Sequence, residues 1–180
     1  MPANETLAQR IAALSAHFTI QRPEGAGPFA TVVLLHGCGG RKPLMDRWAD
    51  VIKQSGCAAI IVDSYAHRRI SRVEAYATVC MGLRLWGRER AGDLYAALAY
   101  ARAQEWCDSN RLVAAGWSHG AWTIMDALSL TSGGEMLRAT GLTDLPEEPL
   151  DGVVATFLAY PYAGRASLAG RRGWRMHPQT

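Results

Sequence analysis

The stretch LVAAGWSHGAW (residues 112–122) decides the fold, because it joins an apolar run to a helical pattern through the pentapeptide GWSHG (residues 116–120). The apolar run predicts a strand and residues 119–130 predict a helix, so the serine falls on a sharp strand-to-helix turn. Such a turn projects a hydroxyl from the edge of a sheet. We therefore predict that Ser118 is a catalytic nucleophile and that the backbone N–H of His119 stabilises an oxyanion. A serine that only caps the helix is the alternative interpretation.

A second motif, LLHGCGGRK (residues 34–42), follows the first strong apolar run. A glycine-rich turn at this place can direct a backbone N–H toward the serine, and the best candidate is the N–H of Cys38. Both common phosphate-binding patterns fail, because Lys42 stands where each of them needs a glycine. His36 is predicted to fix the loop by hydrogen bonding, and the ring of His119 is predicted to point away from the nucleophile. A purely structural glycine turn remains the alternative.

Four short, continuous apolar runs predict strands that are covered on both faces, as in a parallel sheet. They are residues 30–36, 57–63, 111–117 and 152–160. The segments between them have helical character, and this alternation predicts one doubly wound α/β domain over residues 1–180. Residues 17–21 predict a short leading strand. The remaining predictions are an excursion over the top of the sheet at 64–87, a loop or small cap at 131–150, and an irregular tail at 163–180.

The composition excludes several classes of partner. The formal net charge of +3 is small, and four arginines crowd the last sixteen residues, so no basic face for nucleic acid is expected. No apolar run approaches the roughly 18 residues that cross a bilayer, and the N-terminus lacks the apolar centre of a signal peptide. The four cysteines are far apart in the sequence, which predicts a reduced, cytoplasmic protein without structural zinc. No cofactor is expected, and the composition sets no oligomeric state.

Several segments together resemble the dienelactone hydrolase family. They are HGCGG (36–40), IIVDSYAHRR (60–69), RAGDLYAALAYA (90–101) and DSNRLVAAGWSHGAW (108–122). The resemblance covers residues 31–162 and implies an α/β-hydrolase fold that hydrolyses small-molecule esters or lactones through an acyl-enzyme. Dienelactone hydrolases use a cysteine nucleophile, so Ser118 favours a serine-esterase relative. Three residues are predicted to contact substrate, namely His36, Tyr65 and Arg68.

The catalytic acid and histidine of this superfamily follow the nucleophile in the sequence. After residues 152–160 there is no further apolar run, and the last twenty residues contain no Asp or Glu. His177 is the only histidine after His119 and is therefore the candidate base. Two explanations remain open: the last strands are missing, or His177 folds back onto Ser118. If the acid and base are absent, the chain is expected to keep the pocket without turnover.

Overall fold

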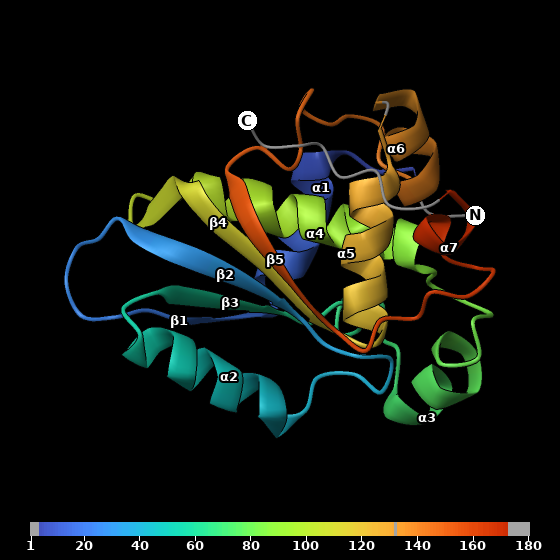
Figure 1. The fold of residues 1–180 in the computed structure, drawn as a ribbon, viewed down its shortest axis with the longest axis horizontal. Coiled ribbons are helices and arrows are strands. Elements are labelled where there is room, and N and C mark those ends of the chain that lie inside the picture. The colour runs from blue at the N-terminus through green and yellow to red at the C-terminus, as the bar shows by residue number, and fades with distance from the viewer. Residues whose placement is uncertain (1–3, 132, 173–180) are drawn as a thin grey trace.

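The computed structural model describes residues 4–131 and 133–172, which form a layered α/β structure (Figure 1). Its helices and strands are α1 (Leu7–Ser15), β1 (Phe18–Gln21), β2 (Phe29–Leu35), α2 (Pro43–Gln54), β3 (Ala58–Val62), α3 (Arg72–Glu74), the π-helix η1 (Ala75–Val79), α4 (Gly87–Arg102), β4 (Cys107–Trp117), α5 (His119–Ser129), α6 (Gly133–Thr140), β5 (Val153–Ala159) and α7 (Leu168–Arg172). All five predicted strands are present near their predicted positions.

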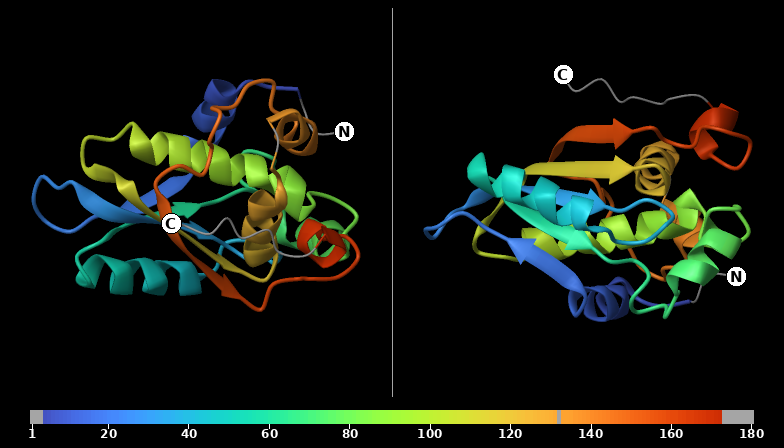
Figure 2. Two further views of the ribbon diagram at one scale, coloured as in Figure 1. Left: turned by 45° about the horizontal axis from the view of Figure 1, so that its top comes forward. Right: turned by 90° about the horizontal axis from the view of Figure 1, so that it is seen from below.

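The five strands form one sheet in the order β1-β3-β2-β4-β5. β1 is antiparallel to β3, and the other neighbouring pairs are parallel. Because parallel strands point the same way, the loops after β2, β3 and β4 meet at one edge of the sheet, where open α/β sheets place their sites. β5 forms the outer edge beside β4, as the views in Figure 2 show.

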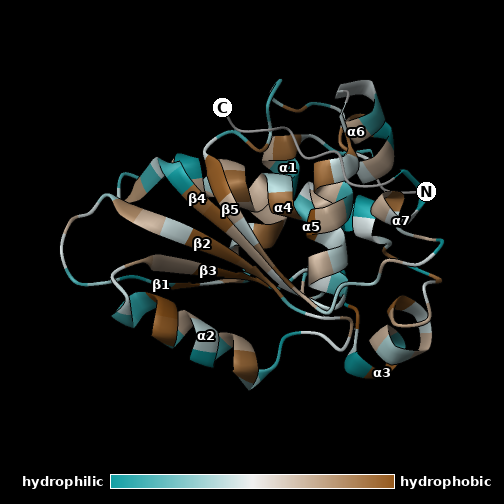
Figure 3. Cartoon of the chain, viewed as in Figure 1, coloured by the Kyte–Doolittle hydropathy of each residue, from teal (hydrophilic) through white to brown (hydrophobic). Residues whose placement is uncertain are grey.

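Helices cover the two faces of the sheet unequally. α1, α4 and α5 lie on one face and α2 lies on the other (Figure 1). The larger buried cluster packs under α1, α4 and α5 and includes Leu94, Leu98 and Ile124. The smaller cluster lies under α2 and includes Leu34 and Ile61. The strands are rich in hydrophobic residues (Figure 3), and β3 is completely buried, as expected for a strand between helices. β5 has four consecutive exposed residues, so the prediction that it is covered on both faces is wrong.

Some segments differ from the sequence prediction. The N-terminal helix α1 was not anticipated, and α7 forms part of the predicted irregular tail. The excursion at 64–87 contains the short helices α3 and η1, and the predicted cap at 131–150 contains α6. Within the described residues no helix combines the length and apolar character needed to cross a membrane.

Candidate active site

Ser118 lies on a strained turn between β4 and α5. Its backbone has φ 51° and ψ −111°, and such a positive φ is rare for a non-glycine residue. Conformations of this kind cost about 1–3 kcal/mol and cluster at active sites. The Ser118 N–H donates to the carbonyl of Ala159 at 2.9 Å, so the turn is also fixed to the end of β5. The strand, the serine and the helix follow one another as the sequence predicts.

The two glycines of the pentapeptide are required by close backbone contacts. A Cβ on Gly116 would overlap the backbone of Gly120. A Cβ on Gly120 would overlap the carbonyl of Leu35, at the end of β2. The helix α5 can therefore begin directly behind the strand end only because neither position carries a side chain. This packing brings Ser118 next to the loop that follows β2.

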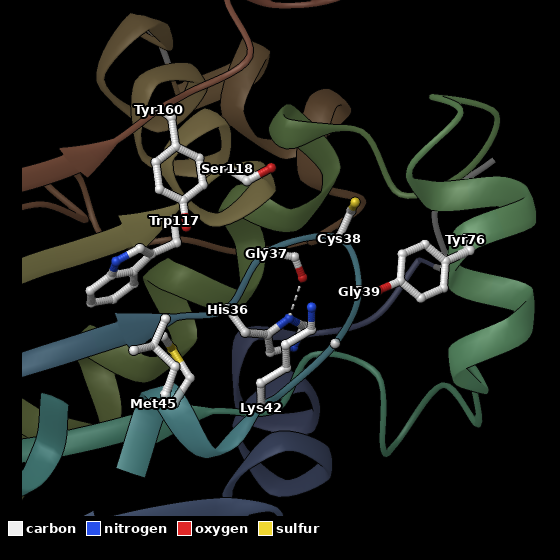
Figure 4. A pocket seen from close by; sticks show the side chains of 12 residues that line it. His36, Gly37, Cys38, Gly39, Lys42, Met45, Tyr76, Trp117, Ser118 and Tyr160 are labelled. Carbon is white, nitrogen blue, oxygen red and sulfur yellow. Dashed lines mark hydrogen bonds between the residues drawn. The ribbon is translucent and has the colours of Figure 1, made fainter. Parts of the chain in front are cut away.

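That loop, residues 36–42, forms one wall of a pocket with Ser118 at its edge (Figure 4). A Cβ on Gly37 would lie 3.4 Å from the Cβ of Ser118, so the glycine loop and the turn at Ser118 are in van der Waals range. The pocket has a volume of about 280 Å³. Its lining residues are His36, Gly37, Cys38, Gly39, Gly40, Lys42, Leu44, Met45, Tyr76, Trp117, Ser118 and Tyr160.

Cys38 lines this pocket, and His119 directly follows the lining residue Ser118. Among the described residues, neither the N–H of Cys38 nor the N–H of His119 has a hydrogen-bond acceptor. His119 is the first residue of α5, where the N–H groups have no partner within the helix. An oxygen that becomes negatively charged beside Ser118 is the kind of acceptor that such donors suit.

Buried side chains hold the carbonyl groups of the glycine loop. His36 Nδ1–H donates to the carbonyl of Gly37 at 2.8 Å, and the hydroxyl of Tyr65 donates to the carbonyl of Cys38 at 2.9 Å. Both side chains are almost completely buried. Burial and the nearby Arg90 hold the pKa of His36 well below its usual value, so its ring is neutral. The Nε2 atom lies 3.8 Å from Asp63, too far for a hydrogen bond.

Of the three residues predicted to contact substrate, one lines the pocket and two do not. His36 lines the pocket, although its ring is engaged with the loop. Tyr65 does not line the pocket and instead supports the loop from behind. Arg68 does not line it either, because its guanidinium makes a two-pronged ion pair with the buried Asp93, with Nη1 and Nη2 each 2.8 Å from a carboxylate oxygen. The structure thus gives Arg68 a structural role in place of the predicted substrate contact.

The cysteines correct another expectation. Cys38 and Cys80 form a disulfide, so the prediction of a fully reduced chain is wrong. The bond joins the glycine loop to the segment that directly follows η1. Sequence spacing could not show this, because the two cysteines are separated by 42 residues. Disulfides are rare in reducing compartments, which weighs against the cytoplasmic prediction. Cys57 and Cys107 are free.

No acid–histidine pair accompanies Ser118 within residues 4–131 and 133–172. The lining of the pocket contains no Asp or Glu, and its one histidine is bound to the loop. Asp126 on α5 is buried, but its Oδ1 accepts from the N–H of Leu168 at 2.7 Å. Burial raises the pKa of Asp126 to about 6. His177 lies outside the described residues. No cluster of His, Cys, Asp and Glu in the described part of the chain is suited to hold a metal ion.

Comparisons with known proteins agree on the fold. The sequence profile of the prolyl oligopeptidase family (Peptidase_S9) matches residues 64–133. A comparison with curated proteins found none that matches the chain. A thermophilic esterase from the planctomycete Thermogutta terrifontis, in its native form, is 16% identical over 90% of this chain and 52% of its own, with a TM-score of 0.54. This chain therefore spans about half the length of that esterase.

A second solved structure resembles this chain to about the same degree. A candidate dienelactone hydrolase from Klebsiella pneumoniae subsp. pneumoniae is 14% identical over 88% of this chain and 85% of its own, with a TM-score of 0.53. At these identities the likeness concerns the fold. Together with the sheet order and the turn at Ser118, it shows that the chain has an α/β-hydrolase fold with a mostly parallel sheet and flanking helices.

Proposed function

We propose that this chain is a serine hydrolase that acts on carboxylic esters or lactones. The observation that carries the proposal is the strained conformation of Ser118 at the edge of a pocket, beside two backbone N–H groups without acceptors. Strain of this kind persists only where the surrounding packing enforces it, and here Gly116 and Gly120 make that packing possible.

In the proposed reaction, the hydroxyl oxygen of Ser118 attacks the carbonyl carbon of the ester. The N–H groups of Cys38 and His119 stabilise the oxyanion that forms. The carbon–oxygen bond of the ester then breaks, the alcohol leaves with the serine proton, and water hydrolyses the acyl-enzyme. A base must carry that proton, and His177 is the candidate from the sequence. The pocket of about 280 Å³ fits a small-molecule substrate.

The finer assignment to the dienelactone-hydrolase type rests on the sequence resemblance over residues 31–162. The candidate dienelactone hydrolase among the solved structures supports it at the level of the fold. Under this proposal the substrate is an ester or lactone, and Ser118 takes the place of the cysteine that dienelactone hydrolases use.

A fluorophosphonate probe and a p-nitrophenyl ester test the proposal together. We expect the probe to label Ser118, the ester to be hydrolysed, and the Ser118→Ala variant to lose both reactions. The exposed serine on β4 offers a matched control, and the Ser109→Ala variant is expected to keep both. Labelling that survives Ser118→Ala, or a folded protein that is never labelled, would contradict the proposal.

A second candidate function is ligand binding without turnover. It is favoured by the lack of a carboxylate and of an available histidine around the pocket in the described part of the chain. In that case Ser118 stays unlabelled while a non-reactive ester analogue still binds, and Trp117 in the pocket wall reports binding through its fluorescence. Labelling at Ser118 decides against this candidate.

A further inference from the structure

Arg90 forms hydrogen bonds with three segments of the site, which follow the strands β2, β3 and β4. This α4 residue is fully buried, with 0% of its surface exposed. Its Nη1 lies 2.7 Å from the carbonyl oxygen of His36 and 2.9 Å from Nδ1 of His119. Its Nε donates to the hydroxyl of Ser64 at 2.8 Å. One guanidinium therefore contacts the residues that follow β2 and β3 and the first residue of α5.

The contact with His119 has a defined direction. His119 Nε2 lies 2.7 Å from the carbonyl oxygen of Leu85, which can only accept, so Nε2 carries the hydrogen. Nδ1 is then the acceptor for Arg90. Burial and the charge of Arg90 lower the pKa of His119 to about 3, which keeps the ring neutral. The side chain of His119 is therefore held between α4 and the end of the excursion.

The charge of Arg90 is compensated in an unusual way. Arg10, which is also buried, binds the carboxylates of Glu5 and Asp93 directly. Arg90 instead binds a carbonyl, a ring nitrogen and a hydroxyl, and its Nη2 has no partner among the described residues. A buried cation without a directly bonded carboxylate is costly, and an apolar side chain would fill the same space at less cost. The retained charge indicates a role beyond packing.

Arg90 also reaches the glycine loop through its neighbours. It fixes the carbonyl of His36, and the ring of His36 fixes the carbonyl of Gly37, which belongs to the same peptide group as the N–H of Cys38. The guanidinium also lies 5.9 Å from the centre of the Tyr65 ring, whose hydroxyl holds the carbonyl of Cys38. Three consecutive carbonyl groups of the loop are thus held by Arg90 or by residues in contact with it.

We propose that Arg90 is a positioning residue for the oxyanion hole, because its guanidinium sets the loop that carries the Cys38 N–H against the turn that carries the His119 N–H. This inference rests on the proposed function. Arg90 does not line the pocket and touches no reacting atom. It acts through the geometry of two backbone donors, which must be preorganised to within a fraction of an ångström to be effective.

The test compares the Arg90→Met and Arg90→Lys variants with Arg10→Met as the matched control for the loss of a buried arginine. We expect Arg90→Met to lower the maximal rate constant of fluorophosphonate labelling about 10- to 100-fold, less than the 10²- to 10³-fold effect of losing a donor outright. The half-saturating probe concentration should stay nearly constant. Arg90→Lys is expected to recover part of the rate, and Arg10→Met to keep it in folded protein. Equal rates for Arg90→Met and Arg10→Met would overturn the proposal.

Amide hydrogen exchange provides a readout that does not depend on activity. Loss of Arg90 is expected to accelerate exchange more than elsewhere at Gly40 and Trp122, whose N–H groups donate to the carbonyls of Gly37 and Ser118, whereas loss of Arg10 is expected to leave these amides unchanged. If Arg90→Met fails to fold, the same comparison is made with Arg90→Lys. A wild-type protein that is not labelled contradicts the proposed function alone, and exchange then decides the positioning role. Exchange that is uniform, or equal in the two variants, overturns that role.

Discussion

The central strands β2 and β3 and the outer strand β5 belong to one sheet but differ in how far their residues are buried. All five residues of β3 are buried, and the loops at the ends of β2 and β3 are held by buried His36, Tyr65 and Arg90. β5 has four consecutive exposed residues, and its Phe157 is 46% exposed. The proposed nucleophile and its two backbone donors therefore lie at the densely packed part of the sheet. Residues of a functional site keep their positions best where the surrounding side chains are densely packed. β5 contributes one backbone hydrogen bond to Ser118, from the Ser118 N–H to the carbonyl of Ala159.

The largest expected effect is that of a methyl group at the junction of β2 and α5. Gly120→Ala would drive a Cβ into the carbonyl of Leu35, so β2 and α5 must separate. We expect a loss of more than about 3 kcal/mol in the free energy of unfolding, as for severe overpacking. Gly133→Ala is the control, because a Cβ there meets nothing within 4 Å. Urea unfolding measures both, and equal stabilities would show that the junction is not tight.

The next effect concerns the disulfide that anchors the glycine loop. Cys80→Ser removes a link across 42 residues, and we expect a loss of about 2–4 kcal/mol. Cys57→Ser is the matched control, since Cys57 forms no disulfide. Thermal unfolding with and without reductant provides the measurement. A wild-type protein whose melting temperature does not respond to reductant would contradict the presence of this bond.

A moderate effect of pH follows from the buried histidines. The pKa values of His36 and His119 are lowered from 6.5 in the folded protein, so the unfolded chain binds protons that the folded protein does not. Stability is therefore expected to fall as the pH drops below about 6.5, by about 1.4 kcal/mol per pH unit for each histidine. The raised pKa of Asp126 acts in the opposite direction between pH 4 and 6.

The His119→Gln variant isolates one contribution to this slope. We expect urea unfolding at pH 6, 5.5 and 5 to give a slope that is smaller by about 1.2 kcal/mol per pH unit than that of the wild type. An unchanged slope would mean that His119 takes up a proton in the folded protein.

The smallest effect is expected on β5. Phe157 packs against Trp48 and Trp117, with ring centres 5.9 and 5.6 Å away, yet about half of its surface is exposed. We expect Phe157→Ala to cost less than the roughly 2–5 kcal/mol of a buried truncation such as Ile60→Ala in β3. If the two variants lost the same stability, the contrast between the central strands and β5 would disappear.

The strands and the turn were predictable because their causes are local. Continuous apolar runs identify buried strands, and GWSHG between a strand and a helix identifies the turn at Ser118. The predicted role of His36 as a residue that fixes the loop agrees with its hydrogen bond to Gly37. These features need only neighbouring residues, so a single sequence contains them.

The buried hydrogen bonds and ion pairs that hold the site in place were not predictable in the same way. Arg90 lies 54 residues from His36, and charged residues are usually exposed. One signal was present, since Arg90 is four residues before the apolar Leu94 in α4 and therefore lies on the same face of the helix, where both residues are buried. The prediction that Arg68 contacts substrate could not take account of its ion pair with Asp93, which lies 25 residues away on another element. Long-range pairings of this kind require the tertiary structure.

In the proposed mechanism, the hydroxyl of Ser118 attacks the substrate beside the main-chain N–H groups of Cys38 and His119. A crystal structure of the protein after reaction with an ethyl fluorophosphonate tests it most directly. The account predicts a phosphonyl group on Ser118 with its free oxygen about 2.7–3.1 Å from the nitrogens of both Cys38 and His119. A phosphonyl oxygen that points away from these nitrogens, or an adduct on another residue with Ser118 unmodified, would contradict it.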